Sequence, residues 1–136
     1  MRGAAALIRL GTYEVETLQK RLAEIGVRRA VCEMRIASLA AELEAELANA
    51  RRYAEAGIYL AGFRDGWRQR RAKADGDLAT VQAEEQGARE ALNRAYENLK
   101  KVEHVAALAA AAEAREAAKR EAAQLDELAL RRAVNS

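Results

Sequence analysis

Apolar residues recur at alternating steps of four and three through the first third of this chain, from Ile8 to Tyr53. Eleven of the fourteen positions on this seam are apolar. A 3.5-residue repeat of this length predicts helices that supercoil around each other, because a single helix cannot bury so narrow a stripe. The seam positions are Ile8, Gly11, Val15, Leu18, Leu22, Ile25, Arg29, Cys32, Ile36, Leu39, Leu43, Glu46, Ala50 and Tyr53.

A second seam, richer in alanine, runs from Leu60 to Val102. Gly57 directly follows the first seam, and glycine is the residue that most often ends a helix. We therefore predict helices over about 4–55 and 58–132, with a bend at about 55–58. The expected fold is all-α: a two-helix antiparallel coiled-coil hairpin with the second helix longer and overhanging, as a single coiled-coil domain over residues 1–136.

The bend also predicts which residues face each other across the hairpin. With the bend near residue 56 or 57, position i of the first helix lies roughly opposite position 113 minus i of the second. Leu92 then lies near Leu22, Leu99 lies near Val15, and Val105 lies near Ile8. Near the bend, Glu46 lies opposite Trp67.

Composition supports long helices and excludes other fold classes. Charged residues make up 32% of the 136 residues, proline is absent, and 34 residues are alanine, a composition typical of coiled coils. No alternating pattern indicates a β-strand. The longest apolar run, Val105–Ala112, is far shorter than the roughly 20 residues of a membrane span. With one cysteine and no secretory signal, the chain is predicted to be cytoplasmic.

No group of residues has the spacing of a catalytic or cofactor-binding motif. The chain lacks a glycine-rich phosphate loop, a cluster of metal ligands, and a nucleophile beside a base. We therefore predict no enzymatic activity, no cofactor and no metal site. His104 is expected to be solvated, and Cys32 to fill a core position on the seam.

Four charged residues interrupt the apolar stripes: Arg29, Glu46, Arg64 and Arg71. Two interpretations are open. Polar residues at core positions can fix the register of a coiled coil at some cost in stability. Alternatively, the seam frays near the bend.

The bend is basic and aromatic. Residues 51–73 hold seven arginines and lysines against two acids, a net charge of +5. Phe63 and Trp67, spaced i, i+4, share one helix face, and they form either the local core of the hairpin tip or a docking site for a partner. The charge is modest for a nucleic-acid interface, so no nucleic-acid partner is expected.

The C-terminal stretch is amphipathic. Leu125 and Leu128 form an apolar edge, and Arg131 and Arg132 follow it. In the predicted hairpin this stretch lies on the overhang, so it has no partner within the chain. Such an exposed stripe is typical of a surface that binds another protein.

Two end segments, together with the hairpin pattern, resemble a known family. The ending Leu-Asp-Glu-Leu-Ala…Arg-Arg at Leu125–Arg132 and the opening Leu-Ile-Arg-Leu at Leu7–Leu10 resemble the FliJ family of bacterial flagellar type III export proteins. The resemblance implies a stalk whose terminal end inserts into the hexameric ring of the export ATPase and promotes its assembly. It further implies that the other end contacts the linker of the export-gate membrane protein, and that export chaperones are recycled.

The resemblance also implies roles for particular residues. Phe63 and Trp67 match the spacing of the family's gate-contacting pair, with Trp67 in place of an aliphatic residue, whereas Tyr53 only partly matches its first-helix tyrosines. The chain is expected at the cytoplasmic face of the inner membrane, peripheral to the membrane only through its partners. The residues expected at the ATPase ring are Leu7, Leu10, Leu125, Leu128, Arg131 and Arg132.

Two alternative functions have the same sequence features. One is the counterpart stalk protein of an injectisome, which has the same fold and mechanics. The other is a generic dimeric coiled-coil scaffold, in which the seam pairs between two chains rather than within one.

Overall fold

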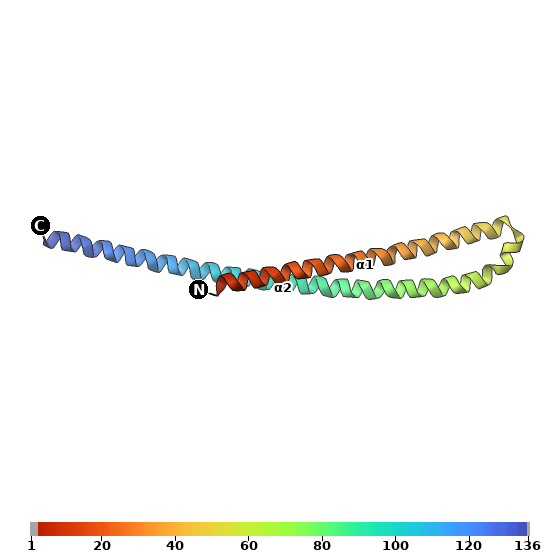
Figure 1. Cartoon of the computed structure of the whole chain (residues 1–136), viewed down its shortest axis with the longest axis horizontal. Helices are drawn as coiled ribbons and strands as arrows, with labels where there is room; N and C mark the ends of the chain where they lie inside the picture. The colour runs from red at the N-terminus through yellow and green to blue at the C-terminus, as the bar shows by residue number, and fades with distance from the viewer. Residues whose placement is uncertain (1–2, 136) are drawn as a thin grey trace. The chain divides into compact units, whose positions relative to one another are not determined.

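The fold is an all-α helical hairpin, as predicted. The computed structural model describes residues 3–135. In them the chain forms α1 (Ala4–Arg52), a six-residue 3-10 helix η1 (Ala54–Tyr59) and α2 (Leu60–Val134), with no strand (Figure 1). The second helix, with 75 residues, is longer than the first, with 49. The residues at which we expected the bend, 55–58, lie within η1.

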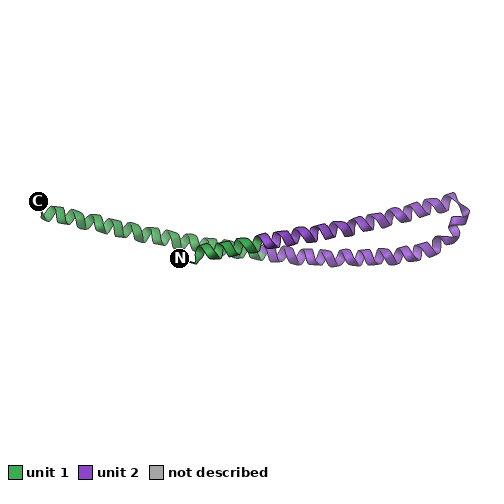
Figure 2. Cartoon of the chain, in the orientation of Figure 1, with its two compact units in different colours: residues 1–15, 94–136 green, residues 16–93 purple. Residues whose placement is uncertain are grey.

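The chain divides into two compact units (Figure 2). Unit 1 comprises Met1–Val15 and Arg94–Ser136, of which residues 3–15 and 94–135 are described. Unit 2 is Glu16–Asn93 and contains the bend. The single coiled-coil domain over residues 1–136 stays a prediction.

The core of unit 2 follows the two seams. From Leu18 to Ala50, every seam position of α1 is buried or half-buried. Ile25 packs with Val81 and Ala88 of α2, and Leu22 and Cys32 lie against this cluster. Large side chains of α1 thus meet small ones of α2, which lets two helices approach closely while both stay well packed.

Charged residues on the seam and beside it pair across the hairpin. The Arg29 Nε donates to the Glu85 carboxylate at 2.8 Å, and Arg28 binds Glu84 at 2.6 Å. Both pairs lie within one residue of the expected register. The seam is therefore not frayed at Arg29, whose charge is matched from the facing helix. That such residues fix the register stays a prediction. These contacts join residues of one chain, so the seam of unit 2 is filled without a second copy.

The Arg28–Glu84 pair gives hairpin stability a pH dependence. The hydrogen bond from Arg28 lowers the pKa of Glu84, so the pair stabilises the fold above the unfolded-state pKa of about 4.3. This contribution is lost as the pH falls through the lower folded-state pKa. We expect the melting temperature to decrease as the pH is lowered below about 4.5. In Glu84→Gln, this decrease of melting temperature with pH should be smaller. Circular dichroism melts from pH 3 to 7 measure it, and an unchanged slope in Glu84→Gln would contradict the assignment.

Unit 1 pairs the start of α1 with the middle of α2. Val15 and Ala95 are buried here. At Gly11 a Cβ atom would lie 3.0 Å from Cδ1 of Leu99, so the absence of a side chain lets the two helices come together. The C-terminal part of α2 continues past the start of α1 (Figure 2). In the register in which position i lies opposite position 113 minus i, Ala4, where α1 begins, lies opposite Ala109. We call residues 110–134 the overhang; apart from the half-buried Ala117, its residues are all exposed.

Glycines in the two units are expected to respond differently to alanine. A methyl group at Gly76 would meet no described atom of another helix within 4 Å. Gly76→Ala is therefore expected to stabilise the chain by about 1 kcal/mol, the gain in helix propensity. Gly11→Ala should gain less, because Leu99 must move to admit the methyl group. Thermal melts of the two variants measure this, and equal stabilisation would contradict the close approach at Gly11.

Candidate protein-interaction surfaces

The aromatic pair near the bend is partly core and partly open. Phe63 and Trp67 are both half-buried on α2. The indole N–H of Trp67 donates to the carbonyl of Leu39 on α1 at 2.6 Å, because a buried indole N–H requires an acceptor. Glu46, the residue expected opposite Trp67, is not the acceptor of this hydrogen bond. Each ring therefore contributes to the tip packing and still presents an edge to solvent.

Arg70 completes the aromatic site. Its guanidinium lies 5.9 Å from the centroid of the Phe63 ring, a cation–π arrangement. The same guanidinium binds Glu42 of α1 at 3.0 Å. Phe63 is thus covered by a charged group that is itself held in place, which fixes the orientation of the ring before any partner arrives.

The bend itself presents apolar side chains to solvent. Tyr53, Ile58 and Tyr59 are 59%, 78% and 74% exposed. None of the six residues of η1, all of them described, is buried. Sequence reasoning did not single out Ile58; the available signal was an Ile-Tyr pair directly after Gly57, where the seam has ended.

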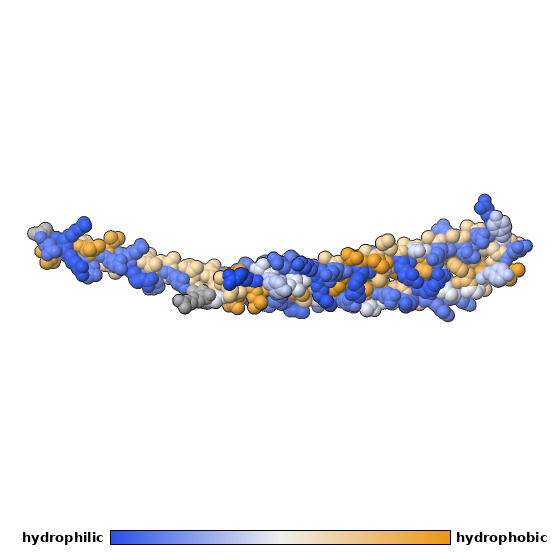
Figure 3. Space-filling model, in the orientation of Figure 1, coloured by the Kyte–Doolittle hydropathy of each residue, from blue (hydrophilic) through white to orange (hydrophobic). Residues whose placement is uncertain are grey.

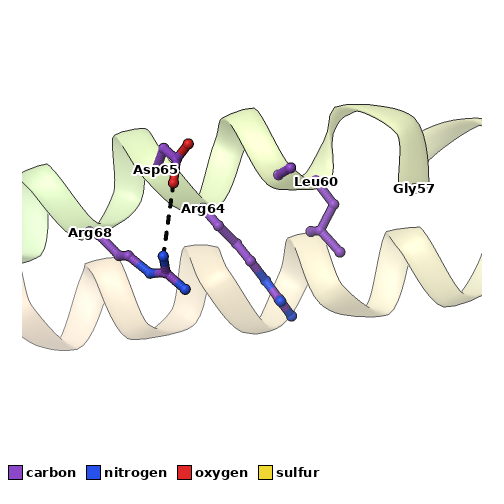
Figure 4. A pocket seen from close by; sticks show the side chains of 6 residues that line it. Gly57, Leu60, Arg64, Asp65 and Arg68 are labelled. Atoms are coloured by element: carbon purple, nitrogen blue, oxygen red, sulfur yellow. Dashed lines mark ion pairs between the residues drawn. The ribbon is translucent and has the colours of Figure 1, made fainter.

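Arginines flank these exposed residues. Arg64 and Arg68 leave the same side of α2 and border a shallow depression of about 380 Å³ beside Gly57 and Leu60 (Figure 4). Arg68 makes only a long contact of 3.9 Å to Asp65, and both side chains are mostly exposed. Arg64, Arg51 and Arg52 form no ion pair with any described residue.

The six residues expected at the ATPase ring fall into two separate places in unit 1. Leu7 lines a small apolar depression with Val102 and Val105. Leu125 lies 20 residues beyond Val105 on the same helix, about 30 Å at 1.5 Å per residue. The structure therefore does not bring Leu7 and Leu10 together with the overhang group Leu125, Leu128, Arg131 and Arg132.

The overhang group presents its side chains to solvent. Leu125 and Leu128 are 66% and 50% exposed. Arg131 binds Glu127 one turn earlier at 3.0 Å, an i, i+4 pair that supports the end of the helix. The group is thus an apolar strip with a charged border on a helix that has no facing partner in unit 1.

A further apolar stripe on α1 was missed from the sequence. Val27, Val31 and Met34 are all exposed and spaced i, i+4, i+7, so they share one face. Val27 and Val31 border a groove of about 400 Å³ whose lining includes Cys32 and Val81. The i, i+4, i+7 spacing is visible in the sequence, but these residues lie beside the seam, and the sequence analysis considered only the seam positions.

Apolar and charged surfaces alternate along the face of the molecule shown in Figure 3.

The remaining candidates are unremarkable. His104 is exposed, and Cys32 is a half-buried free thiol on the seam. Within residues 3–135, no three His, Cys, Asp or Glu side chains are placed to hold a metal ion. No helix in the described part of the chain combines the length and apolarity that crossing a bilayer demands.

Comparison with known proteins places these surfaces in a family context. A family model described as "Flagellar FliJ protein" matches residues 5–136. A protein named "Flagellar FliJ protein" from Caulobacter vibrioides strain NA1000 / CB15N is 53% identical over 130 residues, covering 96% of this chain and 94% of that protein. The protein of the same name from strain ATCC 19089 / CIP 103742 / CB 15 matches to the same extent. No solved structure matches significantly.

Proposed function

This chain belongs to the family of flagellar FliJ proteins, and from that premise we propose that it serves the flagellar type III protein export apparatus as a stalk. In this role it inserts into the hexameric ring of the export ATPase, promotes assembly of the ring and couples it to the export gate. It acts by binding and not by catalysis, and it requires no cofactor.

The observation that carries this proposal is the overhang. Residues 110–134 form a single helix with no facing partner in unit 1 and an exposed apolar strip at Leu125 and Leu128. A lone helix is narrow enough to enter a ring, about 10–12 Å across with its side chains. Its five acids and five bases, counted over residues 104–136, leave it neutral. A neutral surface with little apolar area suits a weak, reversible contact, in which the overhang binds the ring and can also dissociate from it.

Of the two places where the expected ring residues lie, the overhang group is the better supported as the primary contact. Leu7 already packs beside Val102 and Val105 and is 47% exposed. We propose that Leu7 and Leu10 contact the rim of the ring after the overhang has entered. This order follows from the separation of about 30 Å along α2.

We assign the gate contact to the other end of the hairpin, through Phe63 and Trp67. Their solvent-facing edges, with Arg70 fixed beside Phe63, offer the combination of aromatic and arginine groups that dominates protein interfaces. Binding the linker of the export-gate membrane protein would hold the chain at the cytoplasmic face of the inner membrane. Export chaperones are the remaining proposed partners.

Mixing the purified chain with the purified flagellar export ATPase tests the proposal. We expect faster ATP hydrolysis and a larger fraction of hexameric rings by sedimentation. The injectisome counterpart has less support, because the similar proteins carry flagellar names. A dimeric scaffold has less support because Arg28, Arg29 and Arg70 form ion pairs with carboxylates of the facing helix in the same chain. Failure to change either hydrolysis or assembly would contradict the stalk function.

A further inference from the structure

The bend end of unit 2 combines exposed apolar groups with unpaired cations. Tyr53, Ile58 and Tyr59 stand open to solvent with nothing buried in η1, all of whose residues are described. Exposing several large apolar side chains on one short segment is unfavourable in water, and such a cluster marks a surface that is covered by something else.

The charge around this cluster identifies what covers it. Of the seven cations in residues 51–73, Arg70 and Arg71 are bound to carboxylates at 3.0 Å. By contrast, Arg51, Arg52 and Arg64 form no ion pair with any described residue, and these three flank the apolar cluster on both sides in the sequence. Only Glu55 and Asp65 oppose them within the segment.

An apolar tip with aromatic residues and flanking arginines matches a membrane–water interface. Tyrosine partitions to the headgroup region, where its ring contacts acyl chains and its hydroxyl stays hydrated. Arginine side chains extend along the surface and place their charges at lipid phosphates. The depression beside Gly57 and Leu60 is shallow and open, so the site lacks the concave pocket that would grip a peptide or a small molecule.

We propose that the bend, residues 51–64, binds directly to an anionic lipid bilayer, with Ile58 and Tyr59 inserted at the headgroup level and Arg51, Arg52 and Arg64 contacting lipid phosphates. This contact is additional to any protein partner. It goes beyond the expectation from sequence, which placed the chain at the membrane only through its partners, because Ile58 and Tyr59 are exposed.

The contact is reversible and sensitive to salt. Each arginine near an anionic surface strengthens binding by about fivefold at low ionic strength. Three arginines together then contribute about 100-fold, which fades as the Debye length shrinks from roughly 10 Å at 0.1 M to a few ångströms at 1 M salt. The two inserted side chains add an apolar contribution that salt does not weaken.

Co-sedimentation of the full chain with lipid vesicles tests this proposal. We expect binding to vesicles of phosphatidylglycerol and phosphatidylcholine in 0.1 M salt, and almost none to phosphatidylcholine alone. The variant Arg51→Gln/Arg52→Gln/Arg64→Gln should lose about 100-fold in the partition coefficient. Ile58→Ser/Tyr59→Ser should lose about tenfold and bind more weakly at every salt concentration.

The control removes the same amount of charge from the overhang: Arg115→Gln/Lys119→Gln/Arg120→Gln. It should bind vesicles like the unmodified chain, and circular dichroism should show equal helicity in all variants. An equal loss in this control would overturn the proposal, since binding would then follow net charge alone. Binding to no vesicle, with the bend variants impaired only toward an acidic protein partner, would also overturn it. The assay contains no export protein, so its result is independent of the proposed stalk function.

Discussion

Deletion of residues 124–136 should abolish stimulation of the export ATPase while the hairpin stays folded. The deleted segment contains the large exposed apolar side chains of the overhang, which are Leu125, Leu128, Leu130 and Val134. No residue from 124 to 135 is buried, so its removal takes away no core contact that the structure describes. ATP hydrolysis and ring assembly, measured with and without the truncated chain, report the loss, and thermal melting reports the fold.

A double substitution distinguishes the loss of apolar contact with the ring from the loss of helix length. Leu125→Ala/Leu128→Ala keeps the helix, because alanine has the higher helix propensity, and removes only the apolar strip. It should lose most of the stimulation. The matched control, Val27→Ala/Val31→Ala, removes the same kind of exposed surface from unit 2 and should stimulate normally. If the chain that lacks residues 124–136 still stimulated ATP hydrolysis fully, the ring would not bind this end.

Substitution of the aromatic pair should weaken gate binding strongly, with a larger cost in stability for Trp67 than for Phe63. Trp67 is half-buried and donates to the Leu39 carbonyl, so Trp67→Ala is expected to destabilise the chain by about 2 kcal/mol. Phe63→Ala leaves the Arg70–Glu42 pair in place and should cost about 1 kcal/mol. Each variant is expected to reduce affinity for the soluble part of the gate protein by tenfold or more.

Trp67→Phe distinguishes docking from core packing. It retains most of the ring volume, loses the N–H donor and should stay within about 1 kcal/mol of the unmodified chain. Isothermal titration with the gate fragment and thermal melts of the same samples give both quantities. If the loss of affinity across the three variants is proportional to the fall in melting temperature, the pair acts as core and the gate contact lies elsewhere. Leu128→Ala, which lies in unit 1, provides the unaffected reference.

The seam could be predicted because its physical cause is periodic. A repeat of 3.5 residues requires a facing helix, and Gly57, directly after the first seam, indicated the position of the bend between the two helices. The register followed from the bend position, and the Arg28–Glu84 and Arg29–Glu85 pairs lie within one residue of it. Burial of Ile25, Leu39 and Val81 follows from their seam positions.

What could not be predicted depends on local geometry. The hydrogen bond from Trp67 to Leu39 depends on the direction of one indole ring, which a heptad pattern does not encode. The exposure of Ile58 follows from a 3-10 helix at the bend, whose residues turn outward once the seam has ended. The separation of Leu7 from Leu125 required knowing where α1 stops covering α2, which sequence similarity to a family does not reveal.

Every residue of the overhang except Ala117 is exposed, so its helix–coil equilibrium depends little on hairpin unfolding. Alanine propensity and i, i+4 pairs such as Arg131–Glu127 favour the helix here, and few residues are buried, so the amide hydrogens of the overhang should exchange before those of the paired helices. Trypsin should likewise cut first at Arg115, Lys119 and Arg120. When the overhang is bound to a partner, both hydrogen exchange and trypsin cleavage should be slower. An unbound molecule would be degraded from its C-terminal end first, so proteolysis in the cell would remove molecules that are not assembled.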